Sequence, residues 1–347
     1  MTGPHHIRYL KRQDIDPGKW DDCIDRSSNG GVYAYSFYLD NMAPRWDALV
    51  LDDYRAVMPL TWNKKWGIKY LYQPPLTQQL GIFFRDPGTD RWPDKTPGHD
   101  DSKNRDEFRA ETVHAFLEEA ARHFRFAEIF LNYDNAPNAR AHPIKNTRIE
   151  PRMNYILPLD TPYPRLRERY SPALGKNLAA AAGFPLRYTN DFDPAKAISI
   201  YQDRYHKRLS HVKKEDYDRF LKVCLHLQKE GGLLVRAVYE DPGGPPDISP
   251  GPHARLLAVT LLLKKKDRLY LMLPATLPEG RSRQANHFLL DQLIREFAGQ
   301  PLLLDFEGSD IPGIARFYKK FGPTEQPFFF YRFNRLLWPL HLFKKRN

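Results

Sequence analysis

One order of expected secondary structure occurs twice in this chain, and the repeat restricts the fold more than any single motif. In each half, two helices precede three strands, and a long helix and one further strand follow. The first set spans residues 17–133 and the second spans residues 194–305. No sequence identity links the two halves, so a coincidental match between α+β elements is the alternative. The repeat favours an internal duplication that gives two tandem domains.

The periodicity of apolar residues sets the expected elements of both halves. The first half is expected to contain helices within 17–43, strands at 46–51, 54–62 and 68–72, a helix over 108–124 and a strand at 127–133. The second half is expected to contain helices near 194–209 and 215–230, strands at 233–239, 255–263 and 269–273, a helix over 284–298 and a strand at 302–305. Further strands are expected at 153–159 and 328–333, and a helical segment broken by Pro172 at 163–182.

These elements predict an α+β (α/β) fold class, in which mixed, mainly antiparallel central sheets are flanked by helices. The expected domains are 1–160 and 184–347, joined by an interdomain helical segment at 161–183. A length of 347 residues also favours two domains over one.

The chain carries a formal net charge of +11, which indicates an acidic partner. Nucleic acid, a phosphorylated small molecule and an anionic membrane surface all fit, as does a soluble protein with many surface cations. The two cysteines are far apart and the N-terminus has no apolar segment, so a cytoplasmic location is expected. Residues 335–347 mix apolar and basic side chains, and either peripheral membrane contact or packing on the last domain explains them.

Several common site motifs are missing from the sequence. There is no His-Glu-x-x-His or Cys-x-x-Cys pattern, so no metal site is predicted. There is also no Gly-x-Ser-x-Gly or Walker loop.

Residues 302–322 combine a strand, a polar turn and a short helix. The strand ends at Asp305, and Pro312 fits the first turn of the helix, where a missing N–H group costs nothing. Gly322 ends the helix. Such a junction brings a ligand close to the backbone and offers free helix N–H groups to an anion.

Three stretches resemble a known family. Ala315-Arg-Phe-Tyr-Lys-Lys-Phe-Gly322 is similar to the helix that ends many GNAT acyltransferase domains. Leu304-Asp-Phe-Glu-Gly-Ser309 and Tyr170-Ser-Pro-Ala-Leu-Gly-Lys-Asn-Leu-Ala-Ala-Ala-Ala-Gly183 are similar to segments of FemAB-like proteins, which carry two GNAT domains in tandem. The resemblance implies two tandem GNAT-like domains and an acyltransferase activity.

The resemblance also implies roles for individual residues. Tyr318 stands where GNAT enzymes often carry the tyrosine that protonates the leaving thiolate, and a core aromatic is the other interpretation. Glu307 is a candidate general base, or else a carboxylate at a helix N-terminus. Gly308 and Ser309 would contact the donor, and Asp305 would orient a neighbour or cap the turn.

The segment before the second long helix departs from the family pattern. GNAT domains hold the donor pyrophosphate there with a glycine-containing loop, but this chain has Gln284 and Asn286 in place of the two glycines. Side chains at these positions crowd a backbone cradle. Arg281 and Arg283 can still bind phosphate, or they belong to a solvated basic loop. Acyl-CoA is therefore one candidate donor and an anionic ligand of another kind is the alternative.

The interdomain segment and the first domain supply the remaining candidates. The family's basic run is reduced to Lys176, which counts against transfer from aminoacyl-tRNA at this helix, although tRNA stays a candidate partner. Gln78 and Gln79 either line an acceptor groove or are buried amides that bond to their neighbours.

Three hypotheses of function follow. The first is an N- or O-acyltransferase that moves an acyl or aminoacyl group from an activated donor to an amine or hydroxyl by direct attack. The second is a non-catalytic protein in which duplicated GNAT-like domains bind a ligand or partner. The third is a protein that binds tRNA or another nucleic acid through its basic charge.

Overall fold

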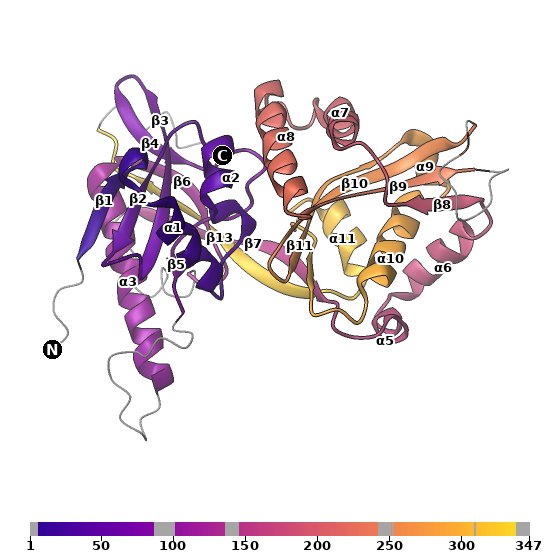
Figure 1. The fold of residues 1–347 in the computed structure, drawn as a ribbon, viewed down its shortest axis with the longest axis horizontal. Coiled ribbons are helices and arrows are strands. Elements are labelled where there is room, and N and C mark those ends of the chain that lie inside the picture. Colours follow the sequence, from indigo (N-terminus) through magenta and orange to yellow (C-terminus); the bar gives the residue numbers. More distant parts are fainter. Residues whose placement is uncertain are drawn as a thin grey trace. The chain divides into compact units, whose positions relative to one another are not determined.

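The computed structural model describes residues 6–86, 101–135, 146–241, 251, 253–308 and 310–337, with the side chains of 101–105 left out. The chain divides into two compact units (Figure 1). Unit 1 comprises Met1–Arg152 and Pro327–Asn347, and unit 2 comprises Met153–Gln326.

Unit 1 contains the first copy of the repeated order. Its elements are β1 (Ile7–Lys11), α1 (Pro17–Arg26), α2 (Ser36–Met42), β2 (Trp46–Leu51), β3 (Ala56–Lys65), β4 (Ile68–Tyr72), β5 (Phe83–Phe84), α3 (Asp101–His123) and β6 (Phe126–Leu131). The strands β1 to β4 pair antiparallel in sequence order, and β4 then pairs parallel with β6. The apolar side of α3 packs on this sheet through Val113, Phe116 and Leu117.

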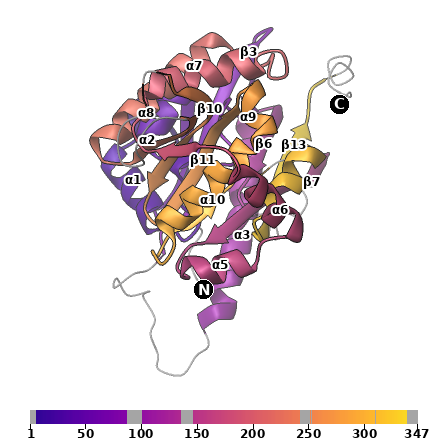
Figure 2. The same cartoon turned by 90° about the vertical axis from the view of Figure 1, so that its right-hand side faces the viewer.

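Unit 2 contains the second copy. Its elements are α5 (Tyr163–Glu168), α6 (Pro172–Ala181), β8 (Leu186–Thr189), α7 (Pro194–Tyr205), α8 (Lys214–Lys229), β9 (Leu233–Glu240), β10 (Arg255–Lys265), β11 (Arg268–Thr276), α9 (Pro278–Ser282), α10 (Ala285–Phe297), β12 (Leu303–Asp305) and α11 (Pro312–Lys319). The strands β8 to β11 again pair antiparallel in order, and β11 pairs parallel with β12. In Figures 1 and 2, α7 and α8 lie on one side of this sheet, and α10 and α6 lie on the other.

Local sequence explains where several helices begin. Asp16, Ser171 and Asp193 each accept hydrogen bonds from backbone N–H groups of the following helix, and each is followed by a proline. A polar N-cap residue and a proline at the first helical position are both favourable at a helix start. Pro172, which was expected to interrupt a helix, therefore begins α6.

The last strand of each copy pairs in the opposite unit. β7 (Thr147–Pro158) follows β6, but its residues Ile156, Leu157 and Pro158 pair with β12 of unit 2. β13 (Thr324–Asn334) follows β12, but from Phe329 onward it pairs with β6 of unit 1. The expected domain limits at residues 160 and 183 therefore do not coincide with the observed division, and the C-terminal segment returns to unit 1.

The expected fold class is confirmed, with a mostly antiparallel sheet flanked by helices in each unit. Within the described ranges, no helix combines the length and the apolar character that crossing a membrane requires. The tail expected to contact a membrane or the last domain lies outside the described residues from position 338 onward.

Candidate active site at the start of α10

A pocket of about 250 Å³ opens at the first turn of α10 in unit 2. It is lined by the end of α7, the end of β11, the helix α9 and the start of α10, through Tyr205, Thr276, Gly280, Arg281, Gln284, Asn286 and His287. Three of the predicted donor-binding residues, Arg281, Gln284 and Asn286, thus line one cavity. The pocket takes its shape partly from Gly280, where a Cβ atom would lie 2.3 Å from the carbonyl oxygen of Leu257.

Gln284 is the N-cap residue of α10 and has a left-handed backbone, with φ 56° and ψ 26°. This conformation favours glycine, which is the residue that the GNAT resemblance implies here. The chain keeps the glycine conformation although it has lost the glycine. The Gln284 side chain makes no capping hydrogen bond, and within the described residues the backbone N–H groups of Ala285, Asn286 and His287 have no acceptor. Free N–H groups at a helix start attract anions.

A chain of polar side chains connects the pocket to α6 and to the residue after α11. Asn177 donates from Nδ2 to Oε1 of Gln284 at 3.1 Å, which holds the glutamine side chain. The Nζ atom of Lys320 lies 3.1 Å from Oδ1 of Asn177 and 3.2 Å from Nε2 of His287. The cation of Lys320 thus joins α6 to the pocket wall.

His287 is a neutral histidine in this network. Burial is the main cause that lowers its pKa to about 4, and the positive charge of Lys320 adds to the effect. Because the lysine can only donate, Nε2 of His287 must accept and the proton must sit on Nδ1. The imidazole ring also packs against Phe317, with ring centroids 4.9 Å apart.

Arg281 and Arg283 separate in the structure. Arg281 is exposed and lines the pocket, so its guanidinium is available to a ligand. Arg283 forms an ion pair with Glu240 and stacks over the ring of Phe184 at 5.6 Å. It does not line the pocket, because Glu240 of β9 holds its side chain elsewhere.

Asp305 ends β12 as a fully buried carboxylate. Its Oδ1 atom accepts from the backbone N–H of Glu307 at 2.8 Å and from Nδ2 of Asn154 at 2.9 Å. Its Oδ2 atom lies 3.2 Å from Nε of Arg268 in an ion pair. These contacts agree with the expected role of capping the turn and orienting neighbours, and they leave this carboxylate inside the protein rather than facing a substrate.

The turn after Asp305 is held in an unusual conformation. Glu307 has a φ of 60° and Gly308 has a φ of 53°. A Cβ atom on residue 308 would lie 2.2 Å from the carbonyl oxygen of Met153, so only glycine fits. Strained backbone of this kind persists where surrounding contacts fix it, which the Asp305 hydrogen bonds do here. Ser309, the other residue expected to contact the donor, lies outside the described residues.

Tyr318 is buried on α11, with its ring 5.0 Å from that of Phe306. Burial is the largest cause that raises the pKa of Tyr318 above that of an ordinary phenol, and the nearby Tyr201, Glu307 and Tyr205 raise it further. Tyr205 also lines the pocket. Tyr318 thus packs against the residue that follows Asp305, and it does not line the pocket at α10.

The remaining candidates do not join this cluster. Lys176 is exposed on α6 and does not line the pocket, whereas its neighbour Asn177 bonds to the pocket wall. Gln78 and Gln79 lie in unit 1, where Nε2 of Gln79 donates to Oε1 of Gln78 at 2.8 Å.

Sequence reasoning missed His287, Lys320, Asn177, Tyr205 and Thr276. His287 had a usable signal, because it stands in the first turn of the same helix as Asn286. Asn177 and Lys320 had none, because they lie 107 and 33 residues from the side chains that they contact. The described residues hold no group of three or more metal-ligating side chains.

Comparisons with known proteins identify the fold. A crystal structure of FemX aligns with a TM-score of 0.61 and 13% identity, covering 98% of this chain and 100% of that one. The C-terminal domain of a putative lysylphosphatidylglycerol synthetase from Agrobacterium fabrum aligns with a TM-score of 0.51 and 11% identity, covering 94% and 93%. L-PGS from Bacillus licheniformis aligns with a TM-score of 0.50 and 12% identity, covering 94% and 95%.

No protein-family model matches the sequence, and no curated protein matches it either. The full-length structural alignments confirm the expected FemAB-type fold of two tandem GNAT-like domains. At identities of 11% to 13% they establish the fold alone.

Proposed function

We propose that the protein is an acyltransferase that moves an acyl or aminoacyl group from an activated, phosphate-bearing donor to an amine or hydroxyl. The observation that carries this proposal is the pocket at the start of α10. It combines three backbone N–H groups without acceptors and the exposed Arg281 in one cavity of about 250 Å³. This is an anion site at a helix start, in the same unit as the buried Tyr318 and the strained turn at Glu307.

The pocket would hold the phosphate of the donor. The helix N-terminus and the guanidinium of Arg281 supply positive charge from two directions. Neutral His287 and the amides of Gln284 and Asn286 would give hydrogen bonds without adding charge. The cation of Lys320 lies behind His287 and increases the positive potential of the pocket.

The reaction would be a direct attack. The acceptor nitrogen or oxygen forms a bond to the donor carbonyl carbon, and the tetrahedral intermediate then breaks its bond to the leaving group. The carboxylate of Glu307 would take the proton that the acceptor loses. The hydroxyl of Tyr318 would give a proton to the departing atom. Glu307 is then protonated and Tyr318 is deprotonated, and a proton that passes from Glu307 to Tyr318 through solvent would restore both side chains for the next turnover.

A cysteine nucleophile does not fit the structure. Both cysteines are buried, and burial raises the pKa of Cys23 to about 12 and also raises that of Cys224. Neither thiol would ionise near neutral pH, and only the thiolate is nucleophilic. Direct transfer therefore remains the route that these residues support.

The properties of Tyr318 favour an oxygen ester over a thioester as the donor. A raised pKa keeps the phenol protonated and makes it a weak acid. It therefore matches a strongly basic alkoxide better than a thiolate, whose conjugate thiol has a pKa of about 8.5. An aminoacyl ester on tRNA is such a donor, and acyl-CoA is the thioester alternative. The name lysylphosphatidylglycerol synthetase, borne by a structure of the same fold, also describes an aminoacyl ester product.

Two measurements test the proposal. Thermal unfolding with acyl-CoA compounds and with charged tRNA should show a rise in melting temperature for the true donor, by mass action. The same ligand should bind at least about tenfold more weakly to Arg281→Gln, because a charge-assisted hydrogen bond contributes about 1.5–3 kcal/mol. The matched variant Arg283→Gln should bind it as the wild type does, because Arg283 pairs with Glu240.

Turnover gives the second measurement. Tyr318→Phe should slow transfer by a factor of about 10²–10⁴, the usual range for a general acid. Tyr331→Phe, which removes another buried phenol from unit 1, should leave transfer unchanged. Equal rates for Tyr318→Phe and the wild type would remove Tyr318 from the mechanism, and no stabilisation by any donor would favour a binding protein.

A further inference from the structure

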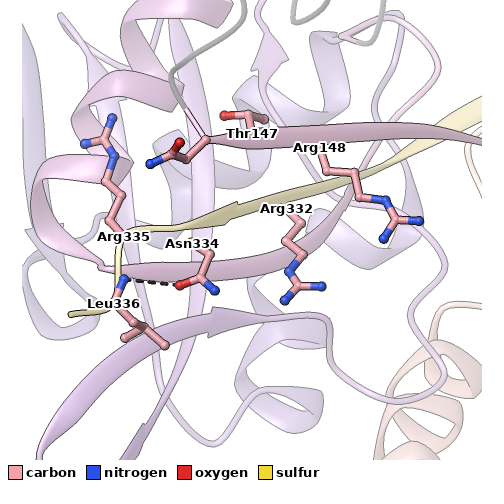
Figure 3. Close-up of a pocket in the computed structure, with 7 residues that line it drawn as sticks. Thr147, Arg148, Arg332, Asn334, Arg335 and Leu336 are labelled. Atoms are coloured by element: carbon pink, nitrogen blue, oxygen red, sulfur yellow. Dashed lines mark hydrogen bonds between the residues drawn. The ribbon is translucent and has the colours of Figure 1, made fainter. Parts of the chain in front are cut away.

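A second cavity, of about 680 Å³, lies in unit 1 where β7 begins and β13 ends. It is lined by Asn146, Thr147, Arg148, Arg332, Asn334, Arg335 and Leu336 (Figure 3). Three of these described lining residues are arginines and none is acidic. The proposed acyl transfer uses none of them, and two of the arginines form ion pairs with carboxylates outside the lining, Arg148 with Glu150 and Arg332 with Glu128.

Arg332 is the most informative side chain of this cavity. Only 11% of it is exposed, and it forms an ion pair with Glu128, whose Oε1 lies 3.6 Å from Nε and thus beyond hydrogen-bond distance. Its guanidinium lies over the ring of Phe126 at 5.5 Å. Within the described residues, this guanidinium, which carries five N–H donors, makes no hydrogen bond. Its nitrogen atoms reach the surface of the cavity, where an acceptor would complete their hydrogen bonds.

A second arginine lies across the sheet from Arg332. The backbone N–H of Asn334 donates to the carbonyl oxygen of Asn146 at 3.4 Å. In an antiparallel pair, a residue two positions earlier on one strand faces a residue two positions later on the other. If Asn334 faces Asn146, Arg332 therefore faces Arg148. Figure 3 shows both side chains on neighbouring strands, pointing to the same side. Like charges in directly opposite positions destabilise a sheet. Arg148 also pairs with Glu150, which offsets part of that repulsion.

We propose that this cavity binds the phosphate or diphosphate group of a small phosphorylated molecule. Neighbouring strands are about 4.8 Å apart, so the two planar guanidinium groups can reach different oxygens of one phosphate. Arg335 donates to the carbonyl oxygen of Ala121 at 3.2 Å and adds charge at the other end of the cavity. The volume is that of a small-molecule pocket, and the side-chain amides of Asn146 and Asn334 can bind the rest of the ligand.

The site is independent of the proposed acyl transfer. All seven lining residues belong to unit 1, and none belongs to the pocket at α10. A molecule held here would be an acceptor with a phosphate group, or a regulator.

Calorimetric titration of the full chain with inorganic pyrophosphate at low ionic strength tests the proposal. We expect binding to the wild type, at least tenfold weaker binding to Arg332→Gln, and a smaller loss for Arg148→Gln, which is 53% exposed. The control Arg122→Gln removes one positive charge from the exposed surface of α3 in the same unit and should leave the affinity unchanged. Arg281→Gln controls for pyrophosphate bound at α10, and it should leave the unit 1 affinity unchanged.

Three results would overturn the proposal. One is the absence of pyrophosphate binding to the wild type, and another is equal affinity in the wild type, Arg332→Gln and Arg148→Gln. The third is binding of uncharged tRNA, with a steep loss on adding salt, that disappears in these variants while pyrophosphate fails to bind. That pattern would assign the arginines to a nucleic-acid surface. Should Arg332→Gln fail to fold, the exposed Arg148→Gln still decides the question.

Discussion

The two units end their central parallel strands in the same way but with side chains of different charge. In unit 1, Oδ1 of Asn132 accepts from the backbone N–H of Asp134 at 3.1 Å. In unit 2, Oδ1 of Asp305 accepts from the backbone N–H of Glu307 at 2.8 Å. Both bonds span two residues, as in an Asx turn. Only the unit 2 turn carries a buried carboxylate, which Arg268 balances.

The units differ more in the link that joins the fourth strand to the long helix, which is β4 to α3 in unit 1 and β11 to α10 in unit 2. In unit 1 the link runs parallel to β6, and Leu80 donates its backbone N–H to the carbonyl oxygen of Phe130 and accepts from the N–H of Asn132, both at 2.8 Å. In unit 2 the last pairing between β11 and β12 is Tyr270 with Asp305, although β11 continues to Thr276. Within the described residues, no segment of unit 2 takes the place of Leu80.

A bulge strengthens this difference. Val259 of β10 pairs with Ala275, and Leu261 pairs with Met272, so Leu273 and Pro274 together face one residue of β10. Leu273 has a φ of 50°, as a bulge residue can. The bulge bends β11 beyond β12, at the level where α9 and α10 form the pocket. The same order of elements thus occurs twice, and the two copies differ before the long helix. Leu80 pairs beside β6 in unit 1, whereas β11 is bulged beyond its pairing with β12 in unit 2.

The largest expected loss of stability comes from Asp305→Asn, which tests whether the charge of the unit 2 turn matters in addition to its backbone conformation. Asp305→Asn keeps a side-chain oxygen for the Glu307 N–H but removes the charge opposite Arg268. Breaking a buried ion pair on one side costs about 3–5 kcal/mol. All six tryptophans lie in unit 1, so the loss should appear in the far-ultraviolet circular dichroism of denaturant unfolding more than in tryptophan fluorescence.

The control is Asp53→Asn, which removes a carboxylate from the exposed ion pair with Lys19 in unit 1. Exposed pairs contribute little to stability. A loss below about 1 kcal/mol for Asp305→Asn would mean that the turn alone matters and that the two units are equivalent there.

Gly308→Ala should have the next largest effect. The left-handed backbone alone costs an alanine about 1–2 kcal/mol, and the new Cβ would also meet the carbonyl oxygen of Met153 at 2.2 Å. The variant should lower the midpoint of denaturant unfolding of unit 2. It should also abolish donor binding at α10 if the turn supports the pocket. Gly67→Ala in unit 1 is the matched control, because Gly67 has a φ of 79° and open space around it. Equal losses for both variants would show that the contact with Met153 is unimportant.

The positions of many helices and strands in both units could be predicted from the sequence, because they depend on the local periodicity of apolar residues. The expected strands at 46–51 and 68–72 match β2 and β4, and the expected long helices match α3 and α10. The exchange of β7 and β13 between units could not be predicted, because the order of elements does not specify which strands pair. The ion pair that holds Arg283 away from the pocket also depends on pairing, since Glu240 is on another strand.

The site shows the same limit. The glycine positions of the resembling family pointed to Gln284 and Asn286, which do line the pocket. The network around Lys320 depends on three segments that are distant in sequence, so it appeared only once they were folded together. Burial, which lowers the pKa of His287 and raises that of Tyr318, is likewise a property of the packed structure.

The next largest expected effect is a loss of stability at acid pH, caused by His287. The pKa of His287 is about 4 in the folded protein and about 6.5 in an unfolded chain. The unfolded state therefore binds the proton more readily, and stability present above pH 6.5 is lost as the pH falls toward 4. Thermal unfolding between pH 7 and 4 should show this loss in the wild type and a smaller one in His287→Gln.

Lys320→Met gives the complementary measurement. Removing the cation takes away the second cause of the depressed pKa, so the pKa of His287 should rise, although burial still holds it below 6.5. The chemical shifts of the His287 ring, followed against pH, report this directly. A pKa of His287 that stays at its wild-type value in Lys320→Met would exclude the charge coupling.

The smallest expected change in stability comes from Gln284→Gly, which makes the pocket more like the GNAT pattern. Glycine relieves the left-handed strain of about 1–2 kcal/mol. It also loses the hydrogen bond to Asn177, which contributes about 0.5–1.5 kcal/mol, and gives more freedom to the unfolded chain. These contributions nearly cancel, so the melting temperature should change little.

The ligand affinity of Gln284→Gly is the more useful readout. If the side chain of Gln284 is what separates this pocket from a backbone pyrophosphate cradle, the variant should bind acyl-CoA more tightly by calorimetry. Gln300→Gly, a change at an exposed residue after α10, controls for the loss of a glutamine elsewhere in unit 2. An unchanged acyl-CoA affinity would mean that the pocket rejects coenzyme A for a reason other than its missing glycine. That result would favour a donor such as an aminoacyl ester, in agreement with the high pKa of Tyr318.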